Sequence, residues 1–194
     1  MVEPPDPAVI VVTGVMAAGK STVAQALAER LPRSAHVRGD VFRRMVVGGR
    51  AEVTGELSPE SMRQLELRHR LAAQVADGYA DAGFTTVLQD IALGDQLVEL
   101  VRAVRTRPRY VVVLAPRADV VARREAGRGK TGYGGGWTVA ELDRALREET
   151  SRLGLWLDTS ELTVTATVDA ILADLPAAAV DEWAYLGRST GSSP

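Results

Sequence analysis

The segment GVMAAGKST, residues 14–22, places one lysine and two hydroxyl side chains after a run of small residues. Its spacing fits the phosphate-binding loop pattern of Gly, four residues, Gly, Lys, then Ser or Thr. Glycines let the backbone curl around a phosphate chain, and a lysine here reaches the β- and γ-phosphates, while the hydroxyl of Ser21 is suited to ligate magnesium. The pattern therefore predicts a nucleoside triphosphate site made by Gly14, Val15, Met16, Ala17, Ala18, Gly19, Lys20, Ser21 and Thr22.

Two aspartates are candidates for chemistry beside this loop. Asp40, in HVRGDVF, follows a short predicted strand and begins a predicted helix, and Asp90 follows another strand. The carboxyl ends of parallel strands lie at one sheet edge, so both would face the phosphate loop. There Asp40 could accept the proton of an acceptor hydroxyl or hold magnesium through water, and Asp90 could hold magnesium through water or contact the acceptor. The alternatives are a helix cap for Asp40 and a capping or turn residue for Asp90.

The segment RREAGRGKTGYGGGW, residues 123–137, is rich in glycine and positive charge. Such a segment stays loose until something orders it, as a closing lid does. Arg124 and Arg128 are four residues apart, so on a continued helix they share a face and could both reach the transferring phosphate. A solvated flexible loop is the alternative.

Strand and helix signals alternate along the whole chain. Short apolar runs predict strands at 8–13, 35–38, 85–89, 109–114 and 153–157. Periodicity and capping residues predict helices at 21–31, 40–47, 59–82, 94–104, 117–126, 138–152 and 165–175. This order predicts an α/β, three-layer P-loop NTPase domain with a mainly parallel five-stranded sheet over residues 8–175. Residues 1–7 and 176–194 are expected to be tails.

Composition narrows the setting of this domain. The chain has 194 residues, 46% of them hydrophobic, and a formal net charge of −2. Cysteine is absent, which excludes disulfides and a cysteine nucleophile and fits a cytoplasmic location. No signal peptide or membrane span is indicated, so we expect no membrane partner. The net charge argues against a nucleic-acid partner, and the oligomeric state stays open.

The classes of triphosphate-using protein can be separated further. The chain contains no asparagine, so it lacks the Asn-Lys-x-Asp segment with which GTPases read guanine. The strand at 109–114 is followed by Ala115 and Pro116, without the acidic pair typical of motor and helicase ATPases. Small-molecule kinases remain. The rival hypotheses are a regulatory NTPase without a small-molecule acceptor and a nucleic-acid 5′-end kinase.

These motifs together resemble a known family. The loop at 14–22, followed by Gly39-Asp40-x-Phe42-Arg43, Asp90 and the lid arginines, is similar to the chloramphenicol phosphotransferase-like kinases. That group is similar to gluconate, shikimate and adenylate kinases and, more distantly, to zeta-toxin kinases. The resemblance implies ATP and Mg²⁺, a hydroxyl on a small molecule as acceptor, Asp40 as general base and phosphate-holding lid arginines near Arg124 and Arg128. The lid here is richer in glycine than that family's.

The acceptor would be read by residues 42–82, beginning with Phe42 and Arg43. Several arginines lie there: Arg43, Arg44, Arg50, Arg63, Arg68 and Arg70. Arginines suit phosphate or carboxylate, which allows an anionic acceptor such as a nucleotide sugar or sugar acid, and the resemblance allows an antibiotic. A helix over 59–82 with a solvated face explains many of the same residues, so we expect Arg63, Arg68 and His69 to face solvent.

Overall fold

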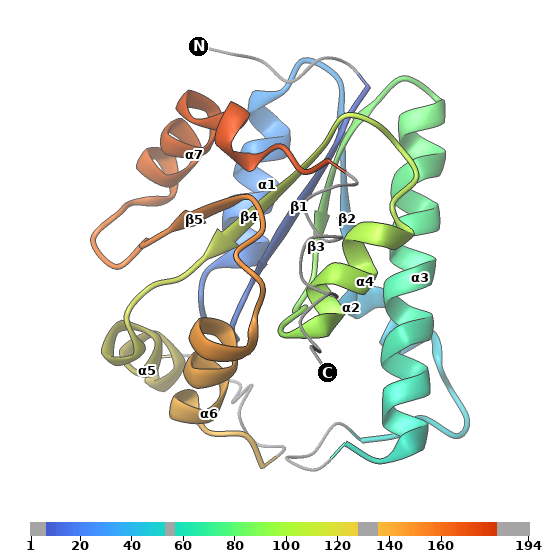
Figure 1. Cartoon of the computed structure of the whole chain (residues 1–194), viewed down its shortest axis with the longest axis vertical. Helices are drawn as coiled ribbons and strands as arrows, with labels where there is room; N and C mark the ends of the chain where they lie inside the picture. The colour runs from blue at the N-terminus through green and yellow to red at the C-terminus, as the bar shows by residue number, and fades with distance from the viewer. Residues whose placement is uncertain (1–6, 53–56, 128–135, 182–194) are drawn as a thin grey trace, which may run out of the picture.

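The centre of the protein is a five-stranded sheet, seen in the computed structural model in Figure 1. The structure describes residues 7–52, 57–127 and 136–181. All strand pairs in the sheet are parallel, and their spatial order is β2-β3-β1-β4-β5. The strands are β1 (Val9–Gly14), β2 (Ser34–Arg38), β3 (Thr85–Gln89), β4 (Arg109–Leu114) and β5 (Leu155–Leu157). The predicted parallel α/β sheet is confirmed.

Burial explains why these segments are strands. Every residue of β1, β3 and β4 is buried, so their apolar runs are covered on both faces. β1 lies at the middle, and the chain leaves it toward β2 on one side and later crosses to β4 on the other. In such a sheet, ligands bind outside the carboxyl ends of the strands where the direction of winding changes. That point is the end of β1.

Helices cover both faces of the sheet (Figure 1). α1 and α7 contact each other, and α3 and α4 contact each other. None of the described helices combines the length and apolar character needed to cross a membrane. The α-helices are α1 (Lys20–Arg30), α2 (Asp40–Met45), α3 (Pro59–Asp81), α4 (Asp95–Ala103), α5 (Ala118–Ala126), α6 (Val139–Arg144) and α7 (Val164–Ala173).

The helix after the predicted lid segment is shorter than the sequence predicts. α6 begins as expected, with Thr138 and Glu141 forming a reciprocal capping box. It then continues only as a π-helical turn over Ala145–Glu149, so the predicted end at residue 152 is wrong. β5 likewise begins at Leu155, because Gly154 before it has a φ of 66° and lies against the backbone of Val111.

The segment expected as a C-terminal tail begins as ordered structure. A 3₁₀ turn over Leu175–Ala178 follows α7, and Ala179 bridges to Tyr110 of β4. Ala178 and Val180 are buried. The packed part of the chain therefore extends to about residue 180, and residues 182–194 lie outside the described ranges.

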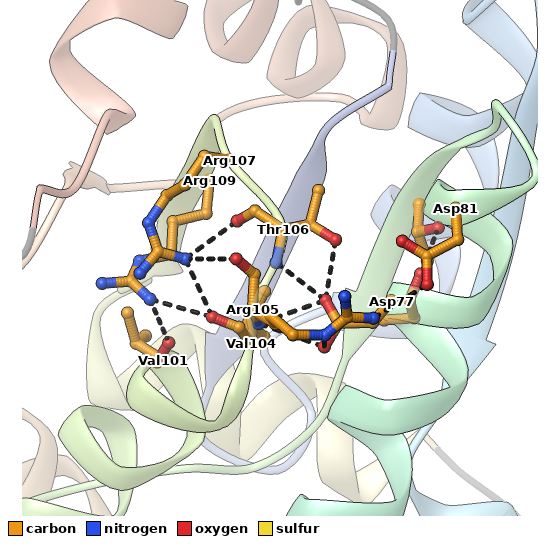
Figure 2. A network of polar contacts seen from close by, with 10 residues as sticks. Asp77, Asp81, Val101, Val104, Arg105, Thr106, Arg107 and Arg109 are labelled. Atoms are coloured by element: carbon orange, nitrogen blue, oxygen red, sulfur yellow. Dashed lines mark hydrogen bonds and ion pairs between the residues drawn. The ribbon is translucent and has the colours of Figure 1, made fainter.

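A polar network lies at the edge where the strands begin (Figure 2). Asp77 of α3 accepts hydrogen bonds from the backbone N–H of Arg105 at 3.0 Å and of Thr106 at 2.9 Å, and from the Thr106 hydroxyl at 2.7 Å. Arg109 is buried and donates to the carbonyls of Val101 and Val104, both at 2.9 Å. We call Asp77, Arg105, Thr106 and Arg109 the amino-edge cluster. It fastens the end of α4 to α3 and β4.

Candidate functional site

The phosphate loop follows β1 and has a backbone that few residues adopt. Gly14 and Gly19 have φ values of 141° and 95°, and Ala17 between them has 60°. A Cβ at Gly14 would overlap the carbonyl oxygen of Leu114 in β4, so only glycine fits there. Gly19 is the N-cap residue of α1. The loop thus joins a tight backbone curl to a helix N-terminus, the arrangement that binds phosphate through backbone N–H groups.

Lys20 and Ser21 take different positions at this helix end. Lys20 is buried, and its Nζ donates to the carbonyl oxygen of Val15 at 2.7 Å, so its charge lies over the loop. Ser21 and Thr22 are exposed. Because Gly19 caps α1, Ser21 does not serve as its N-cap. The Lys20 ammonium over the loop and the solvent-exposed hydroxyl of Ser21 beside it fit a triphosphate with a magnesium ion.

Asp40 lies at the same carboxyl edge, as the first residue of α2. The N-cap residue of α2 is Gly39, and no side chain caps this helix, so the capping role considered for Asp40 is wrong. Its Oδ1 lies 3.6 Å from Nε of Arg38, and its Oδ2 lies 3.1 Å from Nη2 of Arg44. The side chain is 41% exposed. Oδ1 is buried and makes no hydrogen bond to the described residues, so Asp40 is a partly exposed carboxylate between two surface arginines.

Asp90 follows β3 and is completely buried. Arg68 of α3 binds both of its oxygens, with Nε at 2.8 Å from Oδ2 and Nη2 against Oδ1, and the N–H of Ile91 donates to Oδ1 at 2.7 Å. A Cβ at Gly39 would overlap this carboxylate. Asp90 thus packs directly beneath the residue that precedes Asp40. Its contacts suit a positioning role better than direct contact with a ligand.

Arg68 and His69 do not face solvent, so that expectation is wrong. The His69 side chain is 6% exposed, with Nε2 at 3.3 Å from the carbonyl oxygen of Ile91 and 3.8 Å from Oδ2 of Asp90. Burial lowers the pKa of Arg68 to about 10, which leaves the guanidinium charged near neutral pH. Burial and the charge of Arg68 lower the pKa of His69 to about 4, so its imidazole is neutral there. Arg63, in contrast, is exposed and pairs with Glu60, as expected.

The alanines of α3 form a pattern in the sequence that reaches these two positions, although it does not name their partners. Ala72, Ala73, Ala76 and Ala80 recur at helical spacing, and positions 68 and 69 lie four residues before the first two. The buried residues of α3 follow this stripe: Ser61, His69, Ala72, Ala73, Ala76, Asp77 and Ala80. Positions 68 and 69 therefore fall on the stripe that faces the sheet. We call Asp40, Arg68, His69 and Asp90 the carboxyl-edge cluster.

Phe42 and Arg43 extend the site along α2. Phe42 is partly buried and packs against the core. Arg43 pairs with Glu52, with Nη2 at 3.0 Å from Oε2. Between α2 and α3 the structure has a pocket of about 150 Å³, which lies within the region 42–82 expected to read the acceptor.

The segment predicted as a lid, residues 123–137, is described only at its two ends. Arg124 lies on α5, and its Nη2 donates to the carbonyl oxygen of Thr159, in the loop after β5, at 2.9 Å. Arg128 and the glycines at 129, 132, 134 and 135 lie outside the described residues. The described contacts of Arg124 do not bring it to Asp40.

Comparisons with known proteins agree with this fold. Residues 9–149 match the model of a family, AAA_33, described as an AAA domain. No curated protein matches the chain by sequence.

Solved structures similar to the chain include several kinases. A sugar kinase from Janibacter sp. HTCC2649 has 21% identity and a TM-score of 0.63, covering 89% of this chain and 96% of that chain. The APS kinase of Mycobacterium tuberculosis, in complex with AMPPNP and APS, has 19% identity and a TM-score of 0.63 over 89% and 99%. Shikimate kinase from Bacteroides thetaiotaomicron has 20% identity and a TM-score of 0.60 over 87% and 98%. These likenesses show a P-loop kinase-like fold.

Proposed function

The chain belongs to the AAA domain family, and from this premise we propose that it is an ATP- and magnesium-dependent phosphotransferase. The acceptor is a hydroxyl group of a small molecule, of the antibiotic, sugar or nucleotide-sugar type. The chloramphenicol phosphotransferase-like kinases remain the proposed relatives. The observation that carries this proposal is the position of Asp40: a partly exposed carboxylate at the same sheet edge as a phosphate loop with a buried lysine.

The loop residues Gly14 to Thr22 would hold the triphosphate. Their backbone N–H groups and the N-terminus of α1 attract the phosphates, and Lys20 stabilises negative charge on the β- and γ-phosphates. Ser21 would ligate magnesium, which would neutralise negative charge on the phosphates. Thr22 stands next to Ser21 at the same exposed helix end.

Asp40 would act as the general base. The acceptor hydroxyl gives its proton to the Asp40 carboxylate while its oxygen forms a bond to the γ-phosphorus. The bond from that phosphorus to the β–γ bridging oxygen breaks, and ADP leaves with the electron pair. Phe42 and Arg43 would contact the acceptor, and Asp90 would keep Gly39 and Arg68 in place behind Asp40. Arg124 and Arg128 would hold the transferring phosphate when the lid closes.

Replacing Lys20 tests the proposal as a whole. Lys20→Ala should abolish ADP formation with a panel of hydroxyl compounds, because it removes the charge directed at the β- and γ-phosphates. The measurement is ADP release with magnesium and ATP, together with thermal unfolding to show that the variant is folded. Arg30→Ala is a matched control, since it removes a positive charge from the opposite end of α1.

Three results would count against the kinase. Unchanged turnover in a folded Lys20→Ala protein would end the proposal. Nucleotide binding without transfer to any member of the panel would favour the regulatory NTPase. Transfer only to oligonucleotides with a 5′-hydroxyl end would favour the nucleic-acid end kinase.

A further inference from the structure

The pocket between α2 and α3 has a predominantly apolar lining. Its volume is about 150 Å³, and a cavity of roughly that size lined by Leu, Ile and Phe holds a benzene molecule. A six-membered ring therefore fits. Besides Ala51, six larger apolar side chains line it: Phe42, Met45, Val46, Leu65, Leu67 and Leu71. Met45 and Leu67 are 65% and 36% exposed, so apolar surface faces solvent at this pocket.

The charged groups of the lining already have partners. Arg68 is bound to both oxygens of Asp90, and Arg43 pairs with Glu52 and lies 3.4 Å from the carbonyl oxygen of Ala51. An anionic ligand would have to compete with these carboxylates, and separating Arg68 from Asp90 would leave a buried charge without its partner. The arginines of this region therefore do not make it an anion site. An uncharged ligand leaves both pairs intact.

The pocket begins beside the proposed base. Phe42 and Arg43 are two and three residues after Asp40 on the same helix, and Arg44 pairs with Asp40. The charge of Asp40 also acts on the buried guanidinium of Arg68, which lines the pocket from α3. Arg43 lines the pocket and is three residues after Asp40, and residues three apart on a helix are surface neighbours with Cβ atoms about 5–6 Å apart, so the pocket and the carboxylate are within the reach of one small molecule.

We propose that the α2–α3 pocket holds the uncharged, ring-sized apolar body of the acceptor, and that the acceptor is a neutral alcohol whose hydroxyl points toward Asp40. This inference rests on the proposed function and selects among its acceptor classes. It favours amphipathic alcohols over sugar acids and nucleotide sugars, whose charges and many hydroxyls would lose hydration against apolar side chains.

Three probes test the inference by binding alone. Benzyl alcohol carries a ring and one hydroxyl, its para-carboxylate derivative adds one negative charge, and glycerol has hydroxyls without an apolar body. Binding to the full chain is measured by ligand-observed NMR titration. We expect benzyl alcohol to bind, the carboxylate derivative to bind at least about tenfold more weakly, and glycerol not to bind.

Two substitutions on α3 locate the binding. Leu67→Gln should weaken benzyl alcohol binding about tenfold, because it replaces apolar lining by an amide. Val75→Gln is the matched control: Val75 is 38% exposed, close to the 36% of Leu67, and lies two turns further along the helix, outside the pocket. Both positions are at the surface, so both variants should fold.

The outcomes separate this inference from the kinase proposal. Absence of benzyl alcohol binding, tighter binding of either other probe, or equal losses in both variants would overturn the inference. ADP release with hydroxy acids only would also overturn it while leaving the kinase proposal standing. If benzyl alcohol binds and Leu67→Gln weakens this binding while Val75→Gln does not, but the chain transfers phosphate to no alcohol, the pocket assignment stands and the kinase proposal ends.

Discussion

The two ends of the sheet each hold a buried carboxylate with an arginine, yet the two clusters differ in what the polar atoms contact. In the amino-edge cluster, Asp77 accepts from two backbone N–H groups and a threonine hydroxyl, and Arg109 donates to backbone carbonyls (Figure 2). Those bonds replace missing backbone partners where α4 ends and β4 begins. Such a cluster stabilises the fold.

In the carboxyl-edge cluster, the polar atoms contact mainly one another. Arg68 and Asp90 pair through side chains, and the pair supports Gly39, the residue before the partly exposed Asp40. The comparison teaches that burial and charge alone do not mark a functional site. What distinguishes the carboxyl edge is a buried pair next to a partly exposed carboxylate and a phosphate loop.

The largest expected effect is on turnover at the carboxyl edge. Asp40→Asn removes the proposed base while keeping the side chain's size, so kcat should fall about 10²- to 10⁴-fold with little change in ATP affinity. The free energy of unfolding should change by less than about 0.5 kcal/mol, because Asp40 is 41% exposed. Steady-state kinetics, nucleotide titration and urea unfolding measure the three quantities. Full turnover in this variant would show that Asp40 is not the base.

The amino edge should respond in the opposite way. Asp77→Ala leaves the backbone N–H groups of Arg105 and Thr106 without their acceptor, and should lower the free energy of unfolding by about 3 to 5 kcal/mol. Turnover per folded molecule should stay the same, since this cluster lies at the far edge of the sheet. Urea unfolding and kinetics on the folded fraction test both statements.

Asp81 provides the control for this edge. It pairs with Arg105 at 2.8 Å, but its side chain is 60% exposed, so Asp81→Ala should cost less than about 1 kcal/mol. A specific loss of kcat in folded Asp77→Ala, or equal destabilisation by both variants, would break the distinction between the two edges.

The sequence was sufficient for the local patterns and insufficient for the buried pair. Strands at 85–89 and 109–114 have the predicted bounds, because short apolar runs report burial directly. The phosphate loop was found from spacing within nine residues, and its role stays a prediction. The pairing of Arg68 with Asp90 joins residues 22 apart and depends on how α3 lies on the sheet. An arginine is rarely buried without a paired carboxylate, so the sequence alone predicts Arg68 at the surface. Only the structure shows that Asp90 lies close enough to pair with it.

The two histidines allow the two edges of the sheet to be compared through the pH dependence of stability, where the expected effect is smaller. The chain has only two histidines, His36 and His69, and neither belongs to the amino-edge cluster. Burial, followed by the charge of Arg68, lowers the pKa of His69 from 6.5 to about 4, and burial with Arg38 also lowers the pKa of the partly exposed His36. In both cases the unfolded chain binds a proton more readily than the folded one. Both histidines therefore make the folded state less stable as the pH falls.

The pH dependence of stability should report which histidine dominates. Well above pH 6.5, His69 is neutral in both the folded and the unfolded chain, so the part of the free energy of unfolding that depends on His69 is at its maximum, and it falls as the pH drops through 6.5 toward 4. Full loss would amount to about 3 kcal/mol.

Urea unfolding at a series of pH values between 7 and 4.5 gives the free energy of unfolding as a function of pH. The slope of this free energy against pH should be clearly shallower in His69→Gln than in the wild type, while His36→Gln, the control, changes the slope less. Asp77→Ala should lower stability at every pH in this window and leave the histidine-dependent slope in place, since its cluster contains no histidine. An unchanged slope in His69→Gln would mean that His69 is not held neutral against Arg68, and that the carboxyl edge is more open to water than the buried contacts of Arg68 and Asp90 indicate.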